Sequence, residues 1–432
     1  MTQPLGIAIA GLGTVGAGVV RLLAEHGDLL AQRCGRPIKL VAVSAKNKAR
    51  KRDIDLSGVV WRDDPLALVK EPGVDVVVEL IGGSDGVAKQ LVEAAIAAKK
   101  PVVTANKALL ALHGTEIALA AEKAGVALGY EASVAGGIPI IKALREGLVG
   151  NKITRLYGIL NGTCNYILST MRESGRDFAD VLAEAQAHGY AEADPSFDID
   201  GVDAAHKLAI LTSVAFGVPV NFAGVHVEGI RQISALDIEF ARELGYRIKL
   251  LGLARRTENG IEQRVHPCMV PLDAPIAHVE GVFNAIVAEG DFVGKTLFQG
   301  RGAGAGPTAS AVVSDLVDIA RGALLPMFSV PANALSREGA APMQRHVGAY
   351  YVRLTVRDRP GVIAAVAAAL RDEQVSMQSM IQRGRSVDPA GAVRVVLTTH
   401  ETQEAGMMQA VKHIAKLDAM VEPPCVIRIE QI

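Results

Sequence analysis

The chain has 432 residues, which is enough for two to four domains of roughly 150 residues each, and half of its residues are hydrophobic. Its formal net charge of −1 gives it no broad charged surface, which excludes nucleic acid and anionic membranes as partners and favours small molecules and other copies of the chain. Its start lacks a basic segment before an apolar run, and no run approaches the roughly 18 apolar residues of a membrane span, so we expect a cytoplasmic protein.

Residues 1–131 show the alternation that is typical of an α/β domain. Apolar runs of strand length alternate with helix-period stretches; the runs are IAIA, LVAVS, VDVVVELI, VVTA and ALGY. Strands that alternate with helices predict a Rossmann-type parallel sheet with helices on both faces. A later apolar stretch, residues 308–330, is expected to pack back on this nucleotide-binding domain and complete it.

The first strand is followed by a glycine-rich loop, GLGTVG, that opens a helical run. In the dinucleotide fingerprint, Gly11 allows a tight turn, Gly13 lets the backbone approach a pyrophosphate, and Gly16 lets the helix pack closely. The free N–H groups at the helix N-terminus would face the phosphates. The alternative is that these glycines only form a turn and bind no nucleotide. The expected cofactor-binding residues of this loop are Gly11, Leu12, Gly13, Thr14, Val15 and Gly16.

The second strand ends at Ser44 without the acid that would hold the ribose 2′-hydroxyl of NAD. A basic stretch follows instead, and Lys46 with its neighbouring cations could receive a 2′-phosphate. The pattern favours NADP over NAD, with a solvated basic loop as the alternative. The cations are Lys46, Lys48, Arg50, Lys51 and Arg52.

Two features follow the later strands of this domain. Lys107 stands just after the strand that ends at Thr104, at the carboxyl edge where open α/β sheets bind ligands, so it is also expected to contact the cofactor; a surface lysine at a helix start is the alternative. Glu131 is followed by a glycine-rich bend with free carbonyl groups. Such oxygen ligands suit a hard cation, although a plain turn fits as well.

Between residues 132 and 307 the pattern changes to an α+β catalytic domain. Helical stretches over 138–146, 177–188 and 203–216 give way to strand-like runs, which predict a largely antiparallel sheet. The runs are ITRLYGIL, IKLLGLARR, RVHPCMV and FNAIVAEG. The stretch NGTCNYIL either starts a helix capped by Asn161 or Thr163, or turns two asparagines toward a cofactor amide. The four cysteines are scattered without C-x-x-C spacing, so they predict neither a zinc site nor disulfides.

Residues 189–207 hold five carboxylates, one histidine and one lysine. A helix that begins at Gly201 places Asp203 and Lys207 one turn apart on one face, which is the spacing of an ordinary ion pair. That pair does not account for the acids before the same turn, because like charges repel unless a cation lies among them. A substrate ammonium would be such a cation. The preceding acids are Glu192, Asp194 and Asp198.

The last part of the chain differs again. Residues 331–348 form a linker rich in turn-forming residues, and residues 349–432 have the β-α-β-β-α-β order of a ferredoxin-like unit, short enough to be a separate module. Asp358 to Gly361 form a turn before the first helix of this unit, where free N–H groups could receive a carboxylate.

Together these motifs resemble the bacterial homoserine dehydrogenases that carry a C-terminal ACT domain. GLGTVG, TANK, NGTCNY and RGAGAGPTASAVVSDL occur in the expected order, and no kinase domain precedes them, as in the monofunctional form. The family signature is filled without a gap by Ala185, Gly189, Tyr190, Ala191, Asp194, Pro195, Asp198, Ile199, Gly201, Asp203 and Lys207.

The resemblance implies an alcohol oxidoreductase that interconverts L-homoserine and L-aspartate 4-semialdehyde with NAD(P), in threonine, methionine and isoleucine biosynthesis. By family analogy, Glu192 and Asp198 receive the substrate amino group and Tyr190 lies with them. Asp203, Lys107 and Lys207 surround the reacting hydroxyl, with Lys207 as the proton donor.

The same resemblance implies further partners. Gly189 and Gly304 would approach the cofactor from the second domain, and the chain would form a homo-oligomer, a dimer or a tetramer. An amino acid, most simply L-threonine, would regulate it through the ACT domain. A sodium ion would be held by Glu131 and the carbonyl groups of Val134, Gly136 and Ile138.

Two other functions can be weighed against this one. A Rossmann oxidoreductase acting on a sugar or polyol would not need acids that bind an ammonium. A regulator that senses nucleotides and amino acids would not need Lys107 and Lys207, and the sequence shows no pair of DNA-binding helices.

Overall fold

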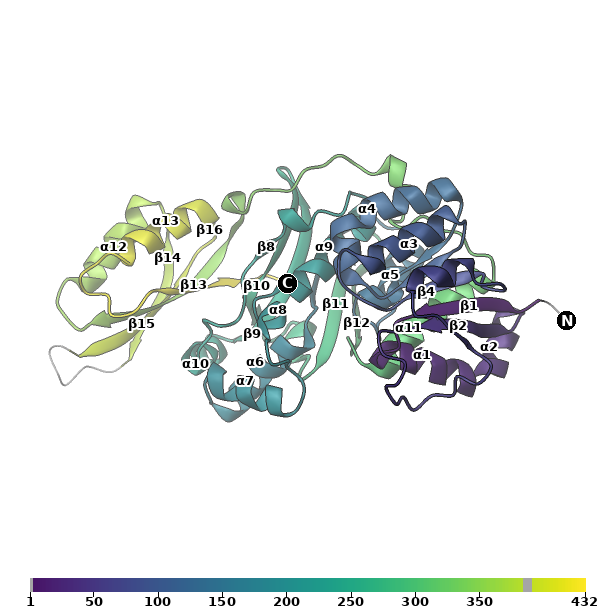
Figure 1. The fold of residues 1–432 in the computed structure, drawn as a ribbon. Helices are drawn as coiled ribbons and strands as arrows, with labels where there is room; N and C mark the ends of the chain where they lie inside the picture. Colours follow the sequence, from purple (N-terminus) through teal and green to yellow (C-terminus); the bar gives the residue numbers. More distant parts are fainter. Residues whose placement is uncertain (1–2, 384–390) are drawn as a thin grey trace.

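The computed structural model describes residues 3–383 and 391–432. The first two residues of the expected nucleotide-binding domain and residues 384–390 of the expected C-terminal unit therefore lie outside the described residues. The molecule is elongated, with the nucleotide-binding unit at one end, the C-terminal unit at the other and the catalytic unit between them (Figure 1).

The nucleotide-binding unit contains a parallel sheet of six strands in the order β3-β2-β1-β4-β5-β6. The direction of winding reverses between β1 and β4, and doubly wound sheets bind ligands at such a switch point. β3 was not predicted, because a strand of two residues carries no periodic signal. The strands are β1 (Leu5–Ala10), β2 (Ile38–Ser44), β3 (Val60–Trp61), β4 (Val76–Glu79), β5 (Val102–Thr104) and β6 (Leu128–Gly129).

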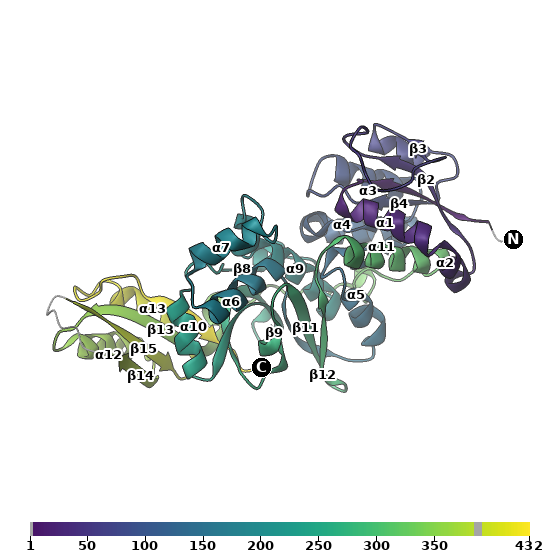
Figure 2. The same cartoon turned by 90° about the horizontal axis from the view of Figure 1, so that it is seen from below.

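Helices cover both faces of this sheet, as the sequence predicts. In β1, Ile7 and Ile9 lie in the core that contains α1 and α11, whereas Ala8 and Ala10 lie in the core that contains α3 and α4. The return of α11 to the first unit is confirmed, and Figures 1 and 2 show it beside α1. The helices are α1 (Thr14–Glu25), α2 (Gly27–Cys34), α3 (Val87–Ala97), α4 (Lys107–Ala124) and α11 (Ala305–Ala320).

The catalytic unit has the predicted antiparallel sheet, with strands β12-β11-β7-β9-β10 in order and β8 (His226–Val227) paired to β10 in parallel. Helix α9 packs on β9 and β10 and also contacts α4 of the nucleotide-binding unit. The strands are β7 (Ile153–Ile159), β9 (Tyr246–Thr257), β10 (Gly260–Pro271), β11 (Phe283–Gly290) and β12 (Gly294–Arg301).

The helices of the catalytic unit differ from the prediction in detail. The expected helix over 138–146 begins after Pro139 and continues as the π-helical turn Ala143–Gly147. Helix α9 begins one residue later than predicted, because Gly201 has a φ of 85° and serves as its N-cap. The helices are α5 (Ile140–Lys142), α6 (Gly162–Ser174), α7 (Phe178–Ala187), α8 (Ser196–Ile199), α9 (Val202–Phe216) and α10 (Ala235–Glu243).

The C-terminal unit has the predicted β-α-β-β-α-β order, with the short strand β16 (Thr402–Gln403) added. Its strands lie in the order β17-β13-β15-β14, and both of its helices cover one face (Figure 1). The elements are β13 (Val347–Arg357), α12 (Val362–Asp372), β14 (Met377–Arg383), β15 (Ala392–Thr399), α13 (Glu404–Ile414) and β17 (Cys425–Ile429).

This unit is not the separate module that its length suggests. Strand β17 pairs in parallel with β10, so that the sheets of the catalytic and C-terminal units form one continuous sheet. The linker also contacts the catalytic unit, since the Ser336 N–H donates to the Gly217 carbonyl at 2.8 Å. In the part of the chain that the structure describes, no helix is both long and apolar enough to cross a bilayer.

Buried ion pairs join the two units beside the β10–β17 pairing. Arg264 of β10 is only 1% exposed, and its guanidinium binds Glu262 at 2.5 Å and Glu430, which directly follows β17. Burial alone would raise the pKa of Glu430, but the Arg264 guanidinium lowers it to about 2. A truncation before Ala349, which the sequence predicts to leave a folded enzyme, would remove this partner of Arg264.

We expect Glu430→Gln to lower the free energy of unfolding by about 3 kcal/mol at pH 7, the low end of the range for a broken buried pair, because Arg264 keeps Glu262. Unfolding in urea, followed by circular dichroism, measures this loss. The depressed pKa means that the Glu430 carboxylate stabilises the fold above its ordinary pKa of 4.5 and ceases to do so as the pH falls toward 2. The difference between parent and variant should shrink over that interval.

Glu338→Gln is the matched control, because Glu338 forms a partly exposed pair with Arg256 at 2.8 Å. Such a pair contributes at most about 1 kcal/mol. Equal stability of the two variants would contradict a structural role for the buried pair.

Candidate active site

The glycine-rich loop has the geometry of a phosphate site. Gly11 has a φ of 102°, and a Cβ there would lie 2.3 Å from the Leu80 carbonyl oxygen. A Cβ at Gly16 would lie 2.0 Å from the Gly11 carbonyl oxygen, whereas one at Gly13 would meet nothing within 4 Å. Gly13 therefore borders open space. It is the N-cap of α1 and has no side chain to accept from the first turn of the helix. Within the described residues, the backbone N–H groups of Thr14 and Val15 therefore remain free for a ligand.

This loop and the basic loop after β2 line one cavity of about 770 Å³. Three of the five predicted cations line it: Lys46, Arg50 and Arg52. Arg52 is committed to the backbone, since it donates to the carbonyl oxygens of Leu12, Asn47 and Arg50 at 2.8 to 3.0 Å. Within the described residues, the side chains of Lys46 and Arg50 have no hydrogen-bond or ion-pair partner, so both remain available to an anion.

The cavity also contains an acid that the sequence argument missed. Asp63 lines it, and its carboxylate accepts a hydrogen bond from the Trp61 indole N–H at 2.9 Å. Sequence reasoning looked for an acid only at the end of β2, whereas Asp63 follows the unpredicted strand β3. Lys48 lies 5.8 Å from the centre of the Trp61 ring instead of lining the cavity.

At the boundary of the two units, the Asp203 carboxylate lies between the two predicted lysines. One oxygen accepts from Lys207 Nζ at 2.7 Å and from Asn161 Nδ2 at 2.9 Å, and the other lies 3.1 Å from Lys107 Nζ. Asp203 is only 4% exposed. Burial alone would raise its pKa, but the ammonium groups of Lys207 and Lys107 hold that pKa well below its ordinary value.

The two lysines are held differently. Lys207 is buried and also donates to the Leu160 carbonyl at 2.7 Å, so that two of its three N–H donors are directed by the protein. The side chain of Lys107 is 35% exposed, begins α4 at the carboxyl edge of β5, and lies 5.7 Å from the centre of the Phe197 ring. The nucleotide-binding unit thus supplies one ammonium and the catalytic unit the other.

A second carboxylate, Asp198, is attached to the same cluster through Asn161. The Asn161 side-chain N–H₂ group donates to Asp198 and to Asp203, both at 2.9 Å, while its carbonyl oxygen caps α6 by accepting from the Cys164 N–H at 2.8 Å. Thr163 donates to the other oxygen of Asp198 at 2.9 Å. The capping prediction is confirmed, and Asn161 also links the two acids.

The alternative, in which both asparagines of this motif face a cofactor amide, does not hold for Asn165. Asn165 is 1% exposed, and its side-chain amide donates to three backbone carbonyls between 2.9 and 3.2 Å. Its oxygen accepts from Lys249 at 3.1 Å. Asn165 therefore fixes the chain around residues 279–283 and does not turn toward a cofactor.

Of the remaining predicted residues, Tyr190 contacts this cluster through its backbone, since its carbonyl oxygen accepts from the Thr163 hydroxyl at 2.9 Å. Glu192 is exposed, and within the described residues its side chain has no hydrogen-bond or ion-pair partner. Tyr190 is 47% exposed and its ring lies 4.7 Å from that of Tyr166. Gly189 follows α7 with a φ of 73°, and Gly304 caps α11 with a φ of 120°.

Glu131 is buried at the N-terminus of α5. Its two oxygens accept from the backbone N–H groups of Ile141 and Lys142 at 2.9 and 2.8 Å. Burial, reinforced by the neighbouring Asp315, raises the pKa of Glu131 to about 7. The Ile138 carbonyl already accepts from the Ile140 N–H at 2.7 Å.

Two of the predicted sodium ligands are free to bind a cation. Within the described residues, the carbonyl oxygens of Val134 and Gly136 accept no hydrogen bond. Together with the Glu131 carboxylate they are oxygen ligands of the kind that a hard cation prefers. The predicted ligand set therefore fits a cation, with Ile138 as its weakest member.

One cluster with metal-binding side chains was not expected. His266, Cys268 and Glu430 bring their ligand atoms within 4.8 Å of one another. Arg264 occupies the centre of this group, since its guanidinium contacts His266 Nε2 at 2.7 Å and pairs with Glu430. A fixed guanidinium excludes a metal cation from the same space, so we assign the cluster to the buried ion pairs between the units.

Comparison with known proteins places the whole chain in one family. Family models match residues 139–317 (homoserine dehydrogenase), 11–131 (homoserine dehydrogenase, NAD binding domain) and 350–417 (ACT domain). A homoserine dehydrogenase of Pseudomonas aeruginosa is 46% identical over 436 residues, covering 100% of both chains. The chain belongs to the homoserine dehydrogenase family. The enzyme is therefore an oxidoreductase that acts on a CH–OH group, with a nicotinamide nucleotide as its cofactor.

Solved structures agree with this assignment. The crystal structure of a homoserine dehydrogenase from Thiobacillus denitrificans has a TM-score of 0.92 and 46% identity, covering 99% of this chain and 98% of that one. A hyperthermophilic archaeal homoserine dehydrogenase in complex with NADPH has a TM-score of 0.64 and 27% identity, covering 75% of this chain and 100% of that one. The resemblance drawn from the sequence motifs is confirmed.

Proposed function

We propose that the Asp203 cluster is the catalytic centre at which the enzyme interconverts L-homoserine and L-aspartate 4-semialdehyde, in the cytoplasm and as part of amino-acid biosynthesis. The observation that supports this proposal is the pair of ammonium groups, one from each unit, on a single buried carboxylate. A reacting oxygen placed beside this cluster would meet both a proton donor and a second positive charge.

Lys207 is the proton donor in the reducing direction. Two of its N–H groups are directed to Leu160 and Asp203, so the third can point to the substrate oxygen. Lys107 stabilises the negative charge that develops on that oxygen, and Asp203 orients both ammonium groups. The nicotinamide, when bound, supplies the hydride. In the oxidising direction Lys207 accepts the hydroxyl proton.

We expect Lys207→Ala to lower kcat by about 10² to 10⁴-fold, the usual contribution of a general acid, and Lys107→Ala to lower it in the same direction. The affinity for NADPH should change little, because neither ammonium is needed by the glycine-rich loop. Lys295→Ala on β12 is the matched control, since the Lys295 side chain is 59% exposed on the edge of the sheet. Stopped-flow and steady-state assays of semialdehyde reduction measure both quantities, and turnover within threefold of the parent in both variants would remove the lysines from the mechanism.

Glu192 and Asp198 receive the substrate ammonium, with Tyr190 beside them. Asp198 is held by Asn161 and Thr163 through neutral donors, so its negative charge is not balanced by a protein cation in these contacts. Glu192 is exposed and unpaired within the described residues. An ammonium between these acids would relieve their mutual repulsion.

Glu192→Gln should raise KM for homoserine about tenfold, because a hydrogen bond to a charged group is weakened by roughly 1.4 kcal/mol or more. The Kd for NADPH should stay the same. Asp194→Asn is the matched control from the same segment, since Asp194 only caps a turn through the Ser196 N–H at 3.1 Å. An unchanged KM in the Glu192 variant would mean that Glu192 is an ordinary solvent-exposed acid and does not bind the substrate.

We further propose that NADP is the preferred cofactor and that NAD is accepted less well. Lys46 and Arg50 line the cavity without a partner, which supports a site for a 2′-phosphate. Gly189 and Gly304 remain proposed contacts to the cofactor, because each has a backbone conformation that glycine adopts readily at a close approach.

Lys46→Glu should raise the Kd for NADPH at least about tenfold more than the Kd for NADH, since a carboxylate would repel the 2′-phosphate. Fluorescence titration of each cofactor measures the two constants. Lys51→Glu makes the same charge change on the same loop but outside the residues that line the cavity, and it should affect both cofactors alike. Equal losses for the two cofactors in the Lys46 variant would argue against a 2′-phosphate site.

A sodium ion would be held by Glu131, Val134, Gly136 and Ile138, and it would keep the Glu131 carboxylate ionised. This proposal is supported by the burial of the Glu131 carboxylate, which has no ion pair within the described residues because the nearby Lys142 ammonium pairs with Asp315 and Asp318. Sodium chloride should then raise the Tm above its value in choline chloride at equal ionic strength, and Glu131→Gln should abolish the difference. Equal Tm values of the parent in both salts would exclude the ion.

The enzyme would assemble as a homo-oligomer, a dimer or a tetramer, and respond to an amino acid through its ACT domain, with L-threonine as the first candidate. The match to an ACT domain supports regulation as such. Analytical ultracentrifugation gives the assembly state. A steady-state threonine titration tests the effector, and uninhibited turnover at millimolar threonine would exclude it.

A further inference from the structure

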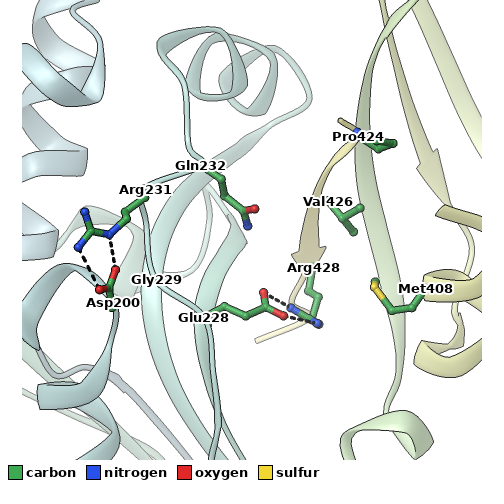
Figure 3. A pocket seen from close by; sticks show the side chains of 9 residues that line it. All are labelled: Asp200, Glu228, Gly229, Arg231, Gln232, Met408, Pro424, Val426 and Arg428. Atoms are coloured by element: carbon green, nitrogen blue, oxygen red, sulfur yellow. Dashed lines mark hydrogen bonds and ion pairs between the residues drawn. The ribbon is translucent and has the colours of Figure 1, made fainter. Parts of the chain in front are cut away.

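A cavity of about 390 Å³ lies between the catalytic and C-terminal units (Figure 3). This volume falls within the range of about 300 to 1,000 Å³ that small-molecule sites occupy. The catalytic unit contributes charged side chains to its wall, and α13 and β17 contribute Met408, Val426 and Arg428. The cavity therefore forms only when the two units are joined by the β10–β17 pairing.

The charges of this cavity come as two guanidinium–carboxylate pairs. Arg231 binds both oxygens of Asp200 at 2.5 and 3.0 Å, and Arg428 binds both oxygens of Glu228 at 2.8 and 2.9 Å. Figure 3 shows the two pairs on separate parts of the wall, with Gln232 projecting into the space beside them. The two guanidinium groups and their two carboxylates are therefore complementary to a ligand that carries one negative and one positive charge.

The two pairs differ in how firmly they are held. Arg428 is almost fully buried and is also bound by Glu404. The side chains of Arg231 and Asp200 are 51% and 42% exposed, and a pair of such exposure contributes little to stability. A ligand carboxylate can therefore replace Asp200 on the Arg231 guanidinium at small cost, while the Arg428–Glu228 pair stays fixed. One Glu228 oxygen also contacts His226 Nε2 at 2.8 Å, so a ligand ammonium would share this carboxylate with Arg428 and His226.

Apart from Gln232, the other side chains of the wall are apolar. The side chains of Met408 and Val426 face the cavity from the C-terminal unit (Figure 3). A short aliphatic or thioether side chain would contact them, whereas a long charged one would not find a partner there.

We propose that this cavity binds a free α-amino acid with a short, largely apolar side chain, and that the C-terminal unit regulates the enzyme through it. The carboxylate of the ligand would bind the Arg231 guanidinium, and its ammonium would bind the Glu228 carboxylate. This inference rests on the proposed regulation by an amino acid, and it locates that regulation away from the turn of residues 358–361.

The cavity wall is in backbone contact with the segment that carries the substrate acids. The Ile230 N–H donates to the Ile199 carbonyl at 2.9 Å, and a Cβ at Gly229 would lie 2.3 Å from the same oxygen. Asp200, which pairs with Arg231, stands between Asp198 and Asp203 in the chain. A ligand that draws Arg231 from Asp200 would therefore act on the turn between two site carboxylates, and it would inhibit if it binds the displaced arrangement better.

The turn of residues 358–361 has no comparable route to the active site. Tyr350 lies opposite Arg428 in the β13–β17 pairing, where β17 meets β10. Arg357 at the end of β13 is seven residues further along the strand, a distance of about 23 Å at 3.3 Å per residue. A ligand at that turn would be remote from the catalytic unit of its own chain.

The test is isothermal titration calorimetry on the full chain, which requires no turnover. L-threonine, L-isoleucine and L-methionine are the probes, and L-threoninol and N-acetyl-L-threonine lack the carboxylate and the ammonium, respectively. At least one amino acid should bind at millimolar concentration or below. Both analogues should bind at least about tenfold more weakly than threonine if threonine is the ligand.

Two variants change the cavity in different ways. Arg231→Gln removes the carboxylate fork, and Met408→Trp fills the apolar side without removing a charge. Each should weaken binding at least about tenfold and reduce inhibition by the same amino acid. In Met408→Trp, kcat without the amino acid should stay within about twofold of the parent, whereas Arg231→Gln also frees Asp200 and is therefore judged on binding. Gly361→Asp, which blocks the remote turn, and Glu192→Gln, which alters the proposed substrate site, should leave binding as in the parent.

The outcomes separate this inference from the proposed function. Parent-like binding in both cavity variants, loss of binding in Gly361→Asp or Glu192→Gln alone, or no binding of any of the three amino acids would overturn it. Failure of the parent to reduce aspartate semialdehyde would instead refute the proposed function, and the calorimetric result would still stand by itself.

Discussion

The active site depends on the burial of the Asp203 carboxylate between the ammonium groups of Lys107 and Lys207. The charges on Asp203 and Lys207 would not be stable alone in so little solvent, because a buried ion must be paired and hydrogen-bonded, and the partly exposed Lys107 adds a second positive charge beside Asp203. Lys107 comes from the nucleotide-binding unit, at the start of α4, whereas Asp203 and Lys207 come from α9. The three charges therefore meet only if α4 packs on α9.

The same constraint orders the residues around it. Asn161 can bridge Asp198 and Asp203 only because Asp203 is ionised and accepts, and Asn161 in turn fixes the start of α6. Asp198, a proposed substrate acid, is thus tied by short polar contacts to the residues that we propose to move the proton. Removal of one charge in this cluster is expected to disturb substrate position as well as proton transfer, so kinetic effects of paired substitutions here should not be additive.

Patterns local in the sequence predicted much of this arrangement. The glycine-rich loop and the pair Asp203–Lys207 each depend on residues within one turn or one loop, and the structure has both. The approach of Lys107 to Asp203 was inferred from its place at the sheet edge and from family resemblance, since residues 96 positions apart carry no periodic signal.

Long-range pairing was the part that the sequence could not specify. The sequence of β17 has the pattern of an ordinary apolar strand. This pattern does not predict that β17 pairs with β10 as well as with β13. Asn165 failed as a predicted cofactor contact for a related reason, because its carbonyl partners lie more than one hundred residues away. Asp63 was missed because it follows a strand of two residues. The division into domains remains a prediction, but the joined sheet limits how independent those domains can be.

The place of β17 within the joined sheet has a consequence for the order in which the chain acquires its structure during synthesis. Arg264 is made early, but its partner Glu430 stands three residues from the C-terminus. At about 5 to 20 residues per second, the ribosome takes roughly 8 to 33 s to reach it. During that time the part of β10 that pairs with β17 lacks this partner strand, and Arg264 has Glu262 but lacks Glu430. The nascent chain therefore passes through a stage in which the joined sheet is incomplete and one strand partner of β10 has still to be made.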